Sequence, residues 1–161
     1  MHAWLVGVAD WLQNVPVILW LGAAQYAYPF VQLTHFTCLS MWLGTTLVLD
    51  FRLMGVGKRF QTASQLSDAL FVWNWIGLGI AVLGGFTLFS IAAVGYIDNP
   101  AFQLKLVLLI PAALAWHIFV QRKTRVWGQE TETPPAAKLA GLIEILLWVS
   151  VATAAVWIPN Y

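Results

Sequence analysis

Two histidines, His35 and His117, stand inside long apolar stretches of this chain of 161 residues. An imidazole in such a place can ligate a metal ion or a haem iron, or it can carry a proton. Cys38 and Met41 continue from His35 at intervals of three residues, so a helix would hold all three side chains near one side. Thiolate and thioether groups favour Cu(I), which makes a copper site at these three residues one hypothesis. The alternative is that Cys38 and Met41 are apolar residues that fill space in a membrane span.

A second hypothesis is a b-type haem held by both histidines. The two axial ligands of one iron must lie at nearly the same depth in the membrane. At about 1.5 Å per helical residue, His35 lies roughly 8 Å inside the outer end of its span, and His117 roughly 8 Å inside the inner end of its own. The difference in depth is on the order of 15 Å, which argues against one haem bound by both residues of one chain. Binding at a single histidine, or at a site shared between subunits, stays open.

Further polar side chains are expected at membrane depth, namely Asp50, Arg52, Asn74, Lys105 and Glu144. Lys105 falls near the depth of His35, which predicts an outer polar layer. The inner polar layer is expected to contain Asp50, Asn74, His117 and Glu144. Ionisable groups in a bilayer are costly and often functional, but these residues could also serve only to satisfy one another by hydrogen bonds. Asp50 and Arg52 are expected to form a pair that anchors a loop.

Basic residues are distributed asymmetrically among the apolar runs. Seven of the eight Lys and Arg residues occur in two stretches, 52–59 and 122–138, and only Lys105 falls on the other side. Basic loops of polytopic proteins remain in the cytoplasm. This pattern predicts that residues 51–68 and 122–137 face the cytoplasm of a bacterium and that both termini face the periplasm.

The composition is that of a membrane protein. Hydrophobic residues make up 60% of the chain and charged residues 9%, which leaves too little polar surface for a water-soluble domain. The net charge of +1 argues against a nucleic-acid partner. A lone cysteine cannot form an internal disulfide, so it does not indicate the redox compartment. Phosphate-binding loops, Ser-His-Asp arrangements, CxxC and HExxH are absent from the sequence, and no catalytic activity is expected.

Four spans and one shorter helix must position the polar residues. The predicted fold is an all-α, single-domain integral membrane four-helix bundle, with spans at 30–50, 69–96, 102–121 and 138–158. Residues 15–28 are too few to cross a bilayer, and Pro29 interrupts the run. They are therefore expected to form an interfacial amphipathic helix, or a re-entrant one, on the outer face. Asn99 and Pro100 predict a tight outer turn between the second and third spans. Pro111 predicts a kink in the third span.

Small residues predict one close helix contact. Gly77, Ala81 and Gly85 recur every four residues on one face of the second span. Such a face lets two helix backbones approach closely in lipid. Packing within the chain is the favoured interpretation, and a homodimer contact is the alternative.

Several motifs resemble those of a small bacterial membrane family of unknown function. His35, then Gly44, then the run DFRLMG at 50–55 follow the order of the family signature. The string NPAFQLK at 99–105 is similar to its turn motif, and His117 ahead of the loop residue Trp127 is similar to another. The resemblance covers nearly the whole chain, while Cys38, Met41 and Glu144 fall outside the motifs. It implies a four-helix membrane architecture, loosely similar in shape to membrane-embedded copper-resistance D proteins.

These patterns lead to two expected functions. The first is a small, non-catalytic inner-membrane protein that binds copper or haem b through His35 or His117, in copper handling or electron transfer. The second is a structural accessory subunit of a larger membrane complex. The expected partners are the lipid bilayer and either such a complex or a periplasmic protein.

Overall fold

The computed structural model describes residues 2–161, except for the side chains of Pro111 and Ala112, which lie outside the described part. Every regular element in this range is a helix, which confirms the all-α prediction. The helices are α1 (His2–Gln13), α2 (Pro16–Ala23), α3 (Ala27–Leu53), α4 (Ala63–Ile91), α5 (Ala93–Ile97), α6 (Pro100–Val107), the π-helical η1 (Leu108–Leu114), α7 (Ala115–Trp127), α8 (Pro135–Trp157) and the 3-10 turn η2 (Ile158–Asn160).

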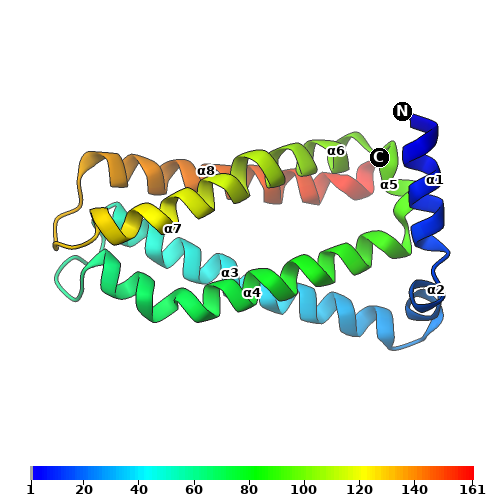
Figure 1. Ribbon diagram of the computed structural model, residues 1–161, viewed down its shortest axis with the longest axis horizontal. Helices are drawn as coiled ribbons and strands as arrows, with labels where there is room; N and C mark the ends of the chain where they lie inside the picture. Colours follow the sequence, from blue (N-terminus) through cyan, green and yellow to red (C-terminus); the bar gives the residue numbers. More distant parts are fainter. Residues whose placement is uncertain (1) are drawn as a thin grey trace.

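Four long helical rods run side by side, formed by α3, α4, the continuous helix α6–η1–α7, and α8 (Figure 1). The loops between α3 and α4 and between α7 and α8 lie at one end of the bundle, which we call the loop end. Both termini lie at the other end, the terminal end, where α1 runs across the long helices (Figure 1). This arrangement places α1 and α2 outside the set of parallel and antiparallel rods.

Three of the described helices are long and apolar enough to cross a membrane: α4, the helix Pro100–Trp127, and the helix Pro135–Asn160. The α1–α2 pair passes the same test only as one unit, and it is bent by 66°. α3 has 27 residues but is more polar than these three. Part of its polarity is directed inward, because Thr46, Asp50 and Arg52 are buried against the other helices.

The break before α3 differs from the position expected at Pro29. α2 ends at Ala23 and α3 begins at Ala27, so Pro29 lies in the first turn of α3. A proline is tolerated there because the first N–H groups of a helix have no partner within the helix. The expected boundary was therefore wrong by a few residues, although a break in the chain is present.

α4 begins at Ala63, six residues before the expected start at residue 69, because a capping box fixes its first turn. The Thr62 hydroxyl accepts from the Gln65 N–H at 3.2 Å, and the Gln65 side chain accepts from the Thr62 N–H at 3.0 Å. Such reciprocal bonds satisfy two N–H groups that a helix start would leave unpaired. α4 thus extends beyond its apolar part into the loop end.

The predicted close packing of α4 against another helix of the chain is confirmed. A Cβ added at Gly77 would lie 3.0 Å from Cβ of Trp42 on α3. One added at Gly85 would lie 3.0 Å from Cε1 of His35, also on α3. Side chains at these two positions would push α3 and α4 apart.

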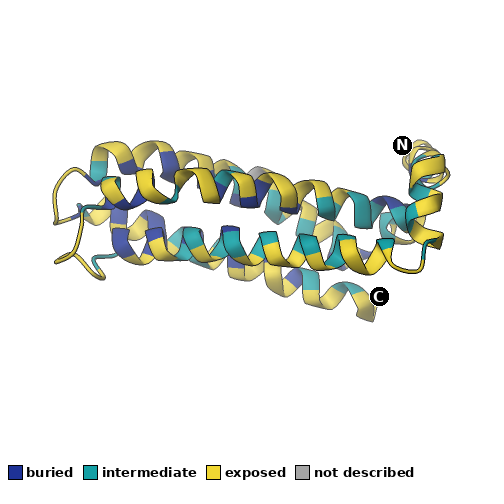
Figure 2. Cartoon of the chain, turned by 90° about the horizontal axis from the view of Figure 1, so that it is seen from below, coloured by how far each residue is buried: buried dark blue, intermediate teal, exposed yellow. Residues whose placement is uncertain are grey.

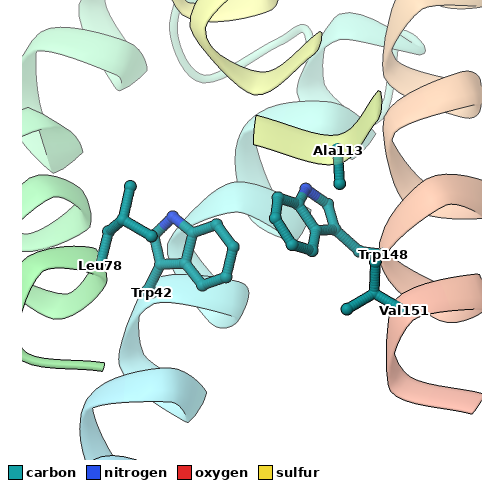
Figure 3. Close-up of a cluster of buried hydrophobic side chains, with 5 residues drawn as sticks. All are labelled: Trp42, Leu78, Ala113, Trp148 and Val151. Atoms are coloured by element: carbon teal, nitrogen blue, oxygen red, sulfur yellow. The ribbon is translucent and has the colours of Figure 1, made fainter. Parts of the chain in front are cut away.

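Buried residues are most frequent toward the loop end and the middle of the bundle, and the terminal end is more exposed (Figure 2). One apolar cluster in the middle contains Trp42, Leu78, Ala113, Trp148 and Val151 (Figure 3). A second, at the loop end, contains Leu53, Ala63, Val120, Ala137 and Ala140.

The kink expected at Pro111 falls on a residue whose side chain lies outside the described part. The backbone from Leu108 to Leu114 is π-helical, within an otherwise continuous helix. A π-helical turn is rare and occurs often at functional sites.

Candidate functional site

Each of the four long rods contributes one polar side chain to the inner layer. Asp50 comes from α3, Asn74 from α4, His117 from α7 and Glu144 from α8. None of these side chains reaches solvent, because their exposed fractions are 1%, 2%, 0% and 1%. Counting residues along the helices had placed these four at similar depth, and the structure brings them together.

His117 is hydrogen-bonded through both ring nitrogens. Its Nδ1 lies 2.5 Å from Oε1 of Glu144, and its Nε2 lies 3.0 Å from Oδ1 of Asn74. The amide nitrogen of Asn74 donates in turn to the hydroxyls of Thr45 at 3.0 Å and Thr46 at 2.9 Å. The inner layer is therefore a continuous chain of hydrogen bonds.

The hydroxyl of Thr45 fixes the orientation of Asn74. This hydroxyl donates its single hydrogen to the backbone carbonyl of Trp42 at 2.8 Å, so it can only accept from Asn74. The amide nitrogen must face Thr45, and the amide oxygen must face His117. Since that oxygen only accepts, Nε2 of His117 carries a hydrogen.

Because Nε2 carries a hydrogen, the contact between Nδ1 of His117 and Oε1 of Glu144 needs one further proton to be a hydrogen bond. With Nε2–H fixed, the two remaining arrangements are an imidazolium beside a carboxylate, or a neutral imidazole beside a carboxylic acid. Without the proton, two acceptors would face each other at 2.5 Å in a buried place. The pair can therefore move its proton between nitrogen and oxygen, but it cannot lose it without losing the hydrogen bond.

Asp50 places a second carboxyl beside this pair. It lies close to the carboxyl of Glu144, and neither of its oxygens has a hydrogen-bond partner among the described residues. A proton between the two carboxyls would form a second bridge, because two carboxyl groups form a hydrogen bond only when one of them carries a proton. Gly141 permits the approach of α8, since a Cβ there would lie 3.0 Å from the Asp50 carbonyl.

Three tryptophans enclose the imidazole. The ring centroids of Trp42, Trp75 and Trp148 lie 5.6, 5.7 and 6.4 Å from that of His117. The rings of Trp42 and Trp148 also meet edge to face, with centroids 4.4 Å apart. We refer to these three rings as the cage. The sequence pattern gave no reason to connect these tryptophans with His117, because they come from three different helices.

The outer layer is separate from the inner one. Nδ1 of His35 lies 2.7 Å from the carbonyl of Ala81, which must accept, so this nitrogen donates. Lys105 is near enough for its charge to act on the imidazole of His35. Ala81 is seven residues from Asn74 along α4, or about 10 Å along the axis. This separation agrees with the expectation that His35 and His117 do not share one iron.

The copper and haem hypotheses find no support in the described part of the chain. Among residues 2–161, no group of three or more His, Cys, Asp and Glu side chains is placed to hold a metal ion. Near His35, the Cys38 carbonyl and the Met41 methyl lie against the position of Gly77, 3.1 Å from the Cβ that this glycine lacks. This segment of α3 therefore packs closely on α4.

The expected pair of Asp50 and Arg52 was wrong. The two residues form no ion pair within the described structure, because side chains two residues apart point to different sides of a helix. Arg52 still anchors loops: its Nε donates to the Gln61 carbonyl at 2.7 Å, and its Nη2 to the Thr131 carbonyl at 2.9 Å. One guanidinium thus ties together both loops at the loop end.

Comparison with known proteins gives one result. No curated protein and no solved structure matches the chain. The expected likeness to copper-resistance proteins therefore remains an analogy of shape. Residues 19–160 match the model of one family, described as a family of unknown function (DUF6644), and the chain belongs to that family.

Proposed function

We propose that this chain is a non-catalytic membrane protein that binds and releases protons inside its helical core. The binding site consists of Asp50, Glu144 and His117, which we call the proton triad. The observation that carries this proposal is the 2.5 Å contact between Glu144 and His117, in a place that solvent does not reach.

The charge of the triad depends on the protons in its two bridges. With both carboxyls ionised and His117 neutral, the triad carries two negative charges and neither bridge holds a proton. One proton in each bridge brings the total charge to zero. Net charge is costly in a buried, poorly polarisable environment, so the folded core favours filled bridges. A purely structural network would not need three ionisable groups, since neutral hydrogen-bonding residues could fill the same places.

The arrangement of charged and aromatic residues supports an orientation in the bacterial inner membrane. Basic residues concentrate toward the loop end, which we place in the cytoplasm. At the terminal end, Trp4, Trp11 and Trp20 on α1 and α2 are 69%, 68% and 63% exposed, as expected for rings at a membrane interface. In this orientation α1 and α2 lie on the periplasmic surface, and α3, α4, α6–α7 and α8 span the bilayer.

The loop end provides the shortest route between the triad and water. Asp50 lies in the last turns of α3, and beyond it are the two loops that Arg52 ties together. Protons therefore exchange with the cytoplasmic side when these loops move apart. The role that follows is that of a proton-responsive membrane component.

Infrared difference spectroscopy between high and low pH tests the proposal on purified protein in lipid. We expect a band from a buried carboxylic acid that is lost in Glu144→Gln or Asp50→Asn. Glu130→Gln and Asp68→Asn remove exposed carboxyls and should leave the band unchanged. A wild-type protein with no titrating buried carboxyl would overturn the proposal and leave the accessory-subunit function.

A further inference from the structure

Three indole N–H groups in the middle of the core have no acceptor among the described residues. They belong to Trp42, Trp75 and Trp148. Trp42 is 2% exposed and Trp148 is 5% exposed, so bulk water does not satisfy these two. Trp116, in contrast, donates to a backbone carbonyl of α8 at 3.1 Å. Buried donors are nearly always hydrogen-bonded, so an unpartnered group points to an acceptor that the protein itself does not supply.

The unpartnered groups share one region. In Figure 3 the indole nitrogen of Trp148 lies on the edge of its ring toward Ala113, and that of Trp42 lies on the edge toward Leu78. The three rings come together around His117, with centroids 5.6 to 6.4 Å from that of the imidazole. Ala113 is fully buried in the same cluster and belongs to the π-helical segment η1. π-helical turns disturb the regular ladder of backbone hydrogen bonds, and inserted water is one of the molecules that accompany such distortions.

This region lies between the two polar layers. On α3, Trp42 comes seven residues after His35 and three before Thr45. On α4, Trp75 follows Asn74 directly and precedes Ala81 by six residues. The cage therefore occupies the length of core that separates the inner layer from the outer one.

The chemistry of the missing acceptor is restricted. All three protein groups are donors, so the bound species must offer lone pairs to indole N–H groups. Water does this, and its own hydrogens can pass to backbone carbonyls nearby. The imidazole of His117, which these rings surround, already engages both of its nitrogens with Glu144 and Asn74. The cluster beyond the indoles consists of apolar side chains, so an ion would find no free charged partner among these described residues.

We infer that Trp42, Trp75 and Trp148 bind internal water, and that this water reorients when the proton triad gains or loses a proton. The inference rests on the proposed function, because the change of charge comes from the triad. The rings of the cage contact His117, so a proton on the imidazole alters the field at the bound water.

The same infrared difference experiment tests the inference when it is run in water labelled with oxygen-18. We expect an O–H stretching band of weakly hydrogen-bonded water in the wild-type difference spectrum, shifted to lower frequency by the heavier oxygen. Trp148→Phe and Trp42→Phe keep a ring but remove the N–H, and each should weaken or remove this band. Trp116→Phe is the matched control and should keep it, since the N–H of Trp116 already has a protein acceptor.

The outcomes separate the two proposals. A carboxyl band without any band sensitive to oxygen-18 would overturn the water site and leave the proton triad standing. An oxygen-18 band that persists in both Trp148→Phe and Trp42→Phe would show that the water lies elsewhere, which also overturns the inference. The absence of a carboxyl band from the wild-type difference spectrum would overturn both the proton triad and the water site. The absence of a band sensitive to oxygen-18 in wild-type protein overturns the inference without any variant. If one tryptophan variant fails to fold, the other still tests where the water lies.

Discussion

Glu144 and His117, from helices α8 and α7, lie 2.5 Å apart and are excluded from solvent. The other nitrogen of His117 must donate to Asn74, so the close contact always needs a proton. The pair therefore does more than link two helices, because the number of protons that it holds is defined. It also makes the stability of the bundle depend on both partners.

Glu144→Ala should reduce the free energy of unfolding by about 3–5 kcal/mol, the usual cost of removing one partner of a buried pair. The variant leaves Nδ1 of His117 and the carboxyl of Asp50 without their partner. Glu144→Gln should cost less, because an amide still donates to a neutral imidazole. Chemical denaturation in detergent measures the difference, with Glu130→Ala as the exposed control. Equal stability of Glu144→Ala and wild type would contradict the network.

Asn74→Leu should lower the free energy of unfolding by about 1–3 kcal/mol, because it leaves the Nε2–H of His117 buried without an acceptor. The shape of the side chain is roughly kept, so the effect reports on hydrogen bonding more than on packing. The measurement is again denaturation in detergent. Asn160→Leu changes an exposed asparagine and should have little effect. If both variants behaved alike, Asn74 would not hold the imidazole.

The inner layer could be predicted because helices in a bundle share an axis, so residue counts along each helix convert to depth. That reasoning grouped Asn74, His117 and Glu144 correctly and separated them from His35. It could not give the partners of Asp50 and Arg52, since the direction of each side chain depends on how α3 is rotated. Nor could it show that three indole N–H groups are unpartnered, because this depends on ring rotamers and on neighbours from other helices.

The helix boundaries could also be predicted only in part from the sequence. The apolar runs predicted four long helices, but the start of α4 followed a local polar signal, the capping box of Thr62 and Gln65. This signal is present in the sequence, whereas the expected start at residue 69 rests on the apolar run alone. Pro29 has the opposite effect: its place in the apolar run predicts a break in the helix, but the first turn of a helix accepts a proline.

Gly85→Leu should destabilise the protein by about 1–3 kcal/mol through overpacking against α3. A Cβ at this position already lies 3.0 Å from the imidazole of His35, and a leucine needs far more space. Gly79→Leu is a matched control on the same helix, since nothing lies within 4 Å of its added Cβ. Thermal melting in detergent should separate the two variants. A lower melting temperature for Gly79→Leu alone would reverse the assigned face of α4.

The ion pair between Lys58 and Glu132 should make a small contribution to stability that depends on pH. The hydrogen bond from Lys58 lowers the pKa of the Glu132 carboxyl below its ordinary value of 4.5. A carboxyl with a lowered pKa in the folded state stabilises the protein above 4.5, and this contribution is lost as the pH falls below that value. Both side chains are largely exposed, so solvent screening keeps the effect small.

Glu132→Gln should therefore melt slightly below wild type at neutral pH, and the two curves should converge at acidic pH. Glu130→Gln removes a neighbouring exposed carboxyl for comparison. A difference that grew as the pH fell would mean that the ion pair does not stabilise the two loops.

The orientation in the membrane can be tested by cysteine labelling of intact cells. The native Cys38 is first replaced by serine, and single cysteines are then placed at Glu130 in the α7–α8 loop and at Asn160 near the C-terminus, both exposed positions. Because basic residues concentrate toward the loop end, we expect an impermeant reagent to label the cysteine at 160 and to leave the one at 130 unlabelled until the cells are opened. The reverse pattern would place the loop end in the periplasm. The proton triad would then exchange protons with the periplasmic side, because the two loops that Arg52 holds together would lie on that side.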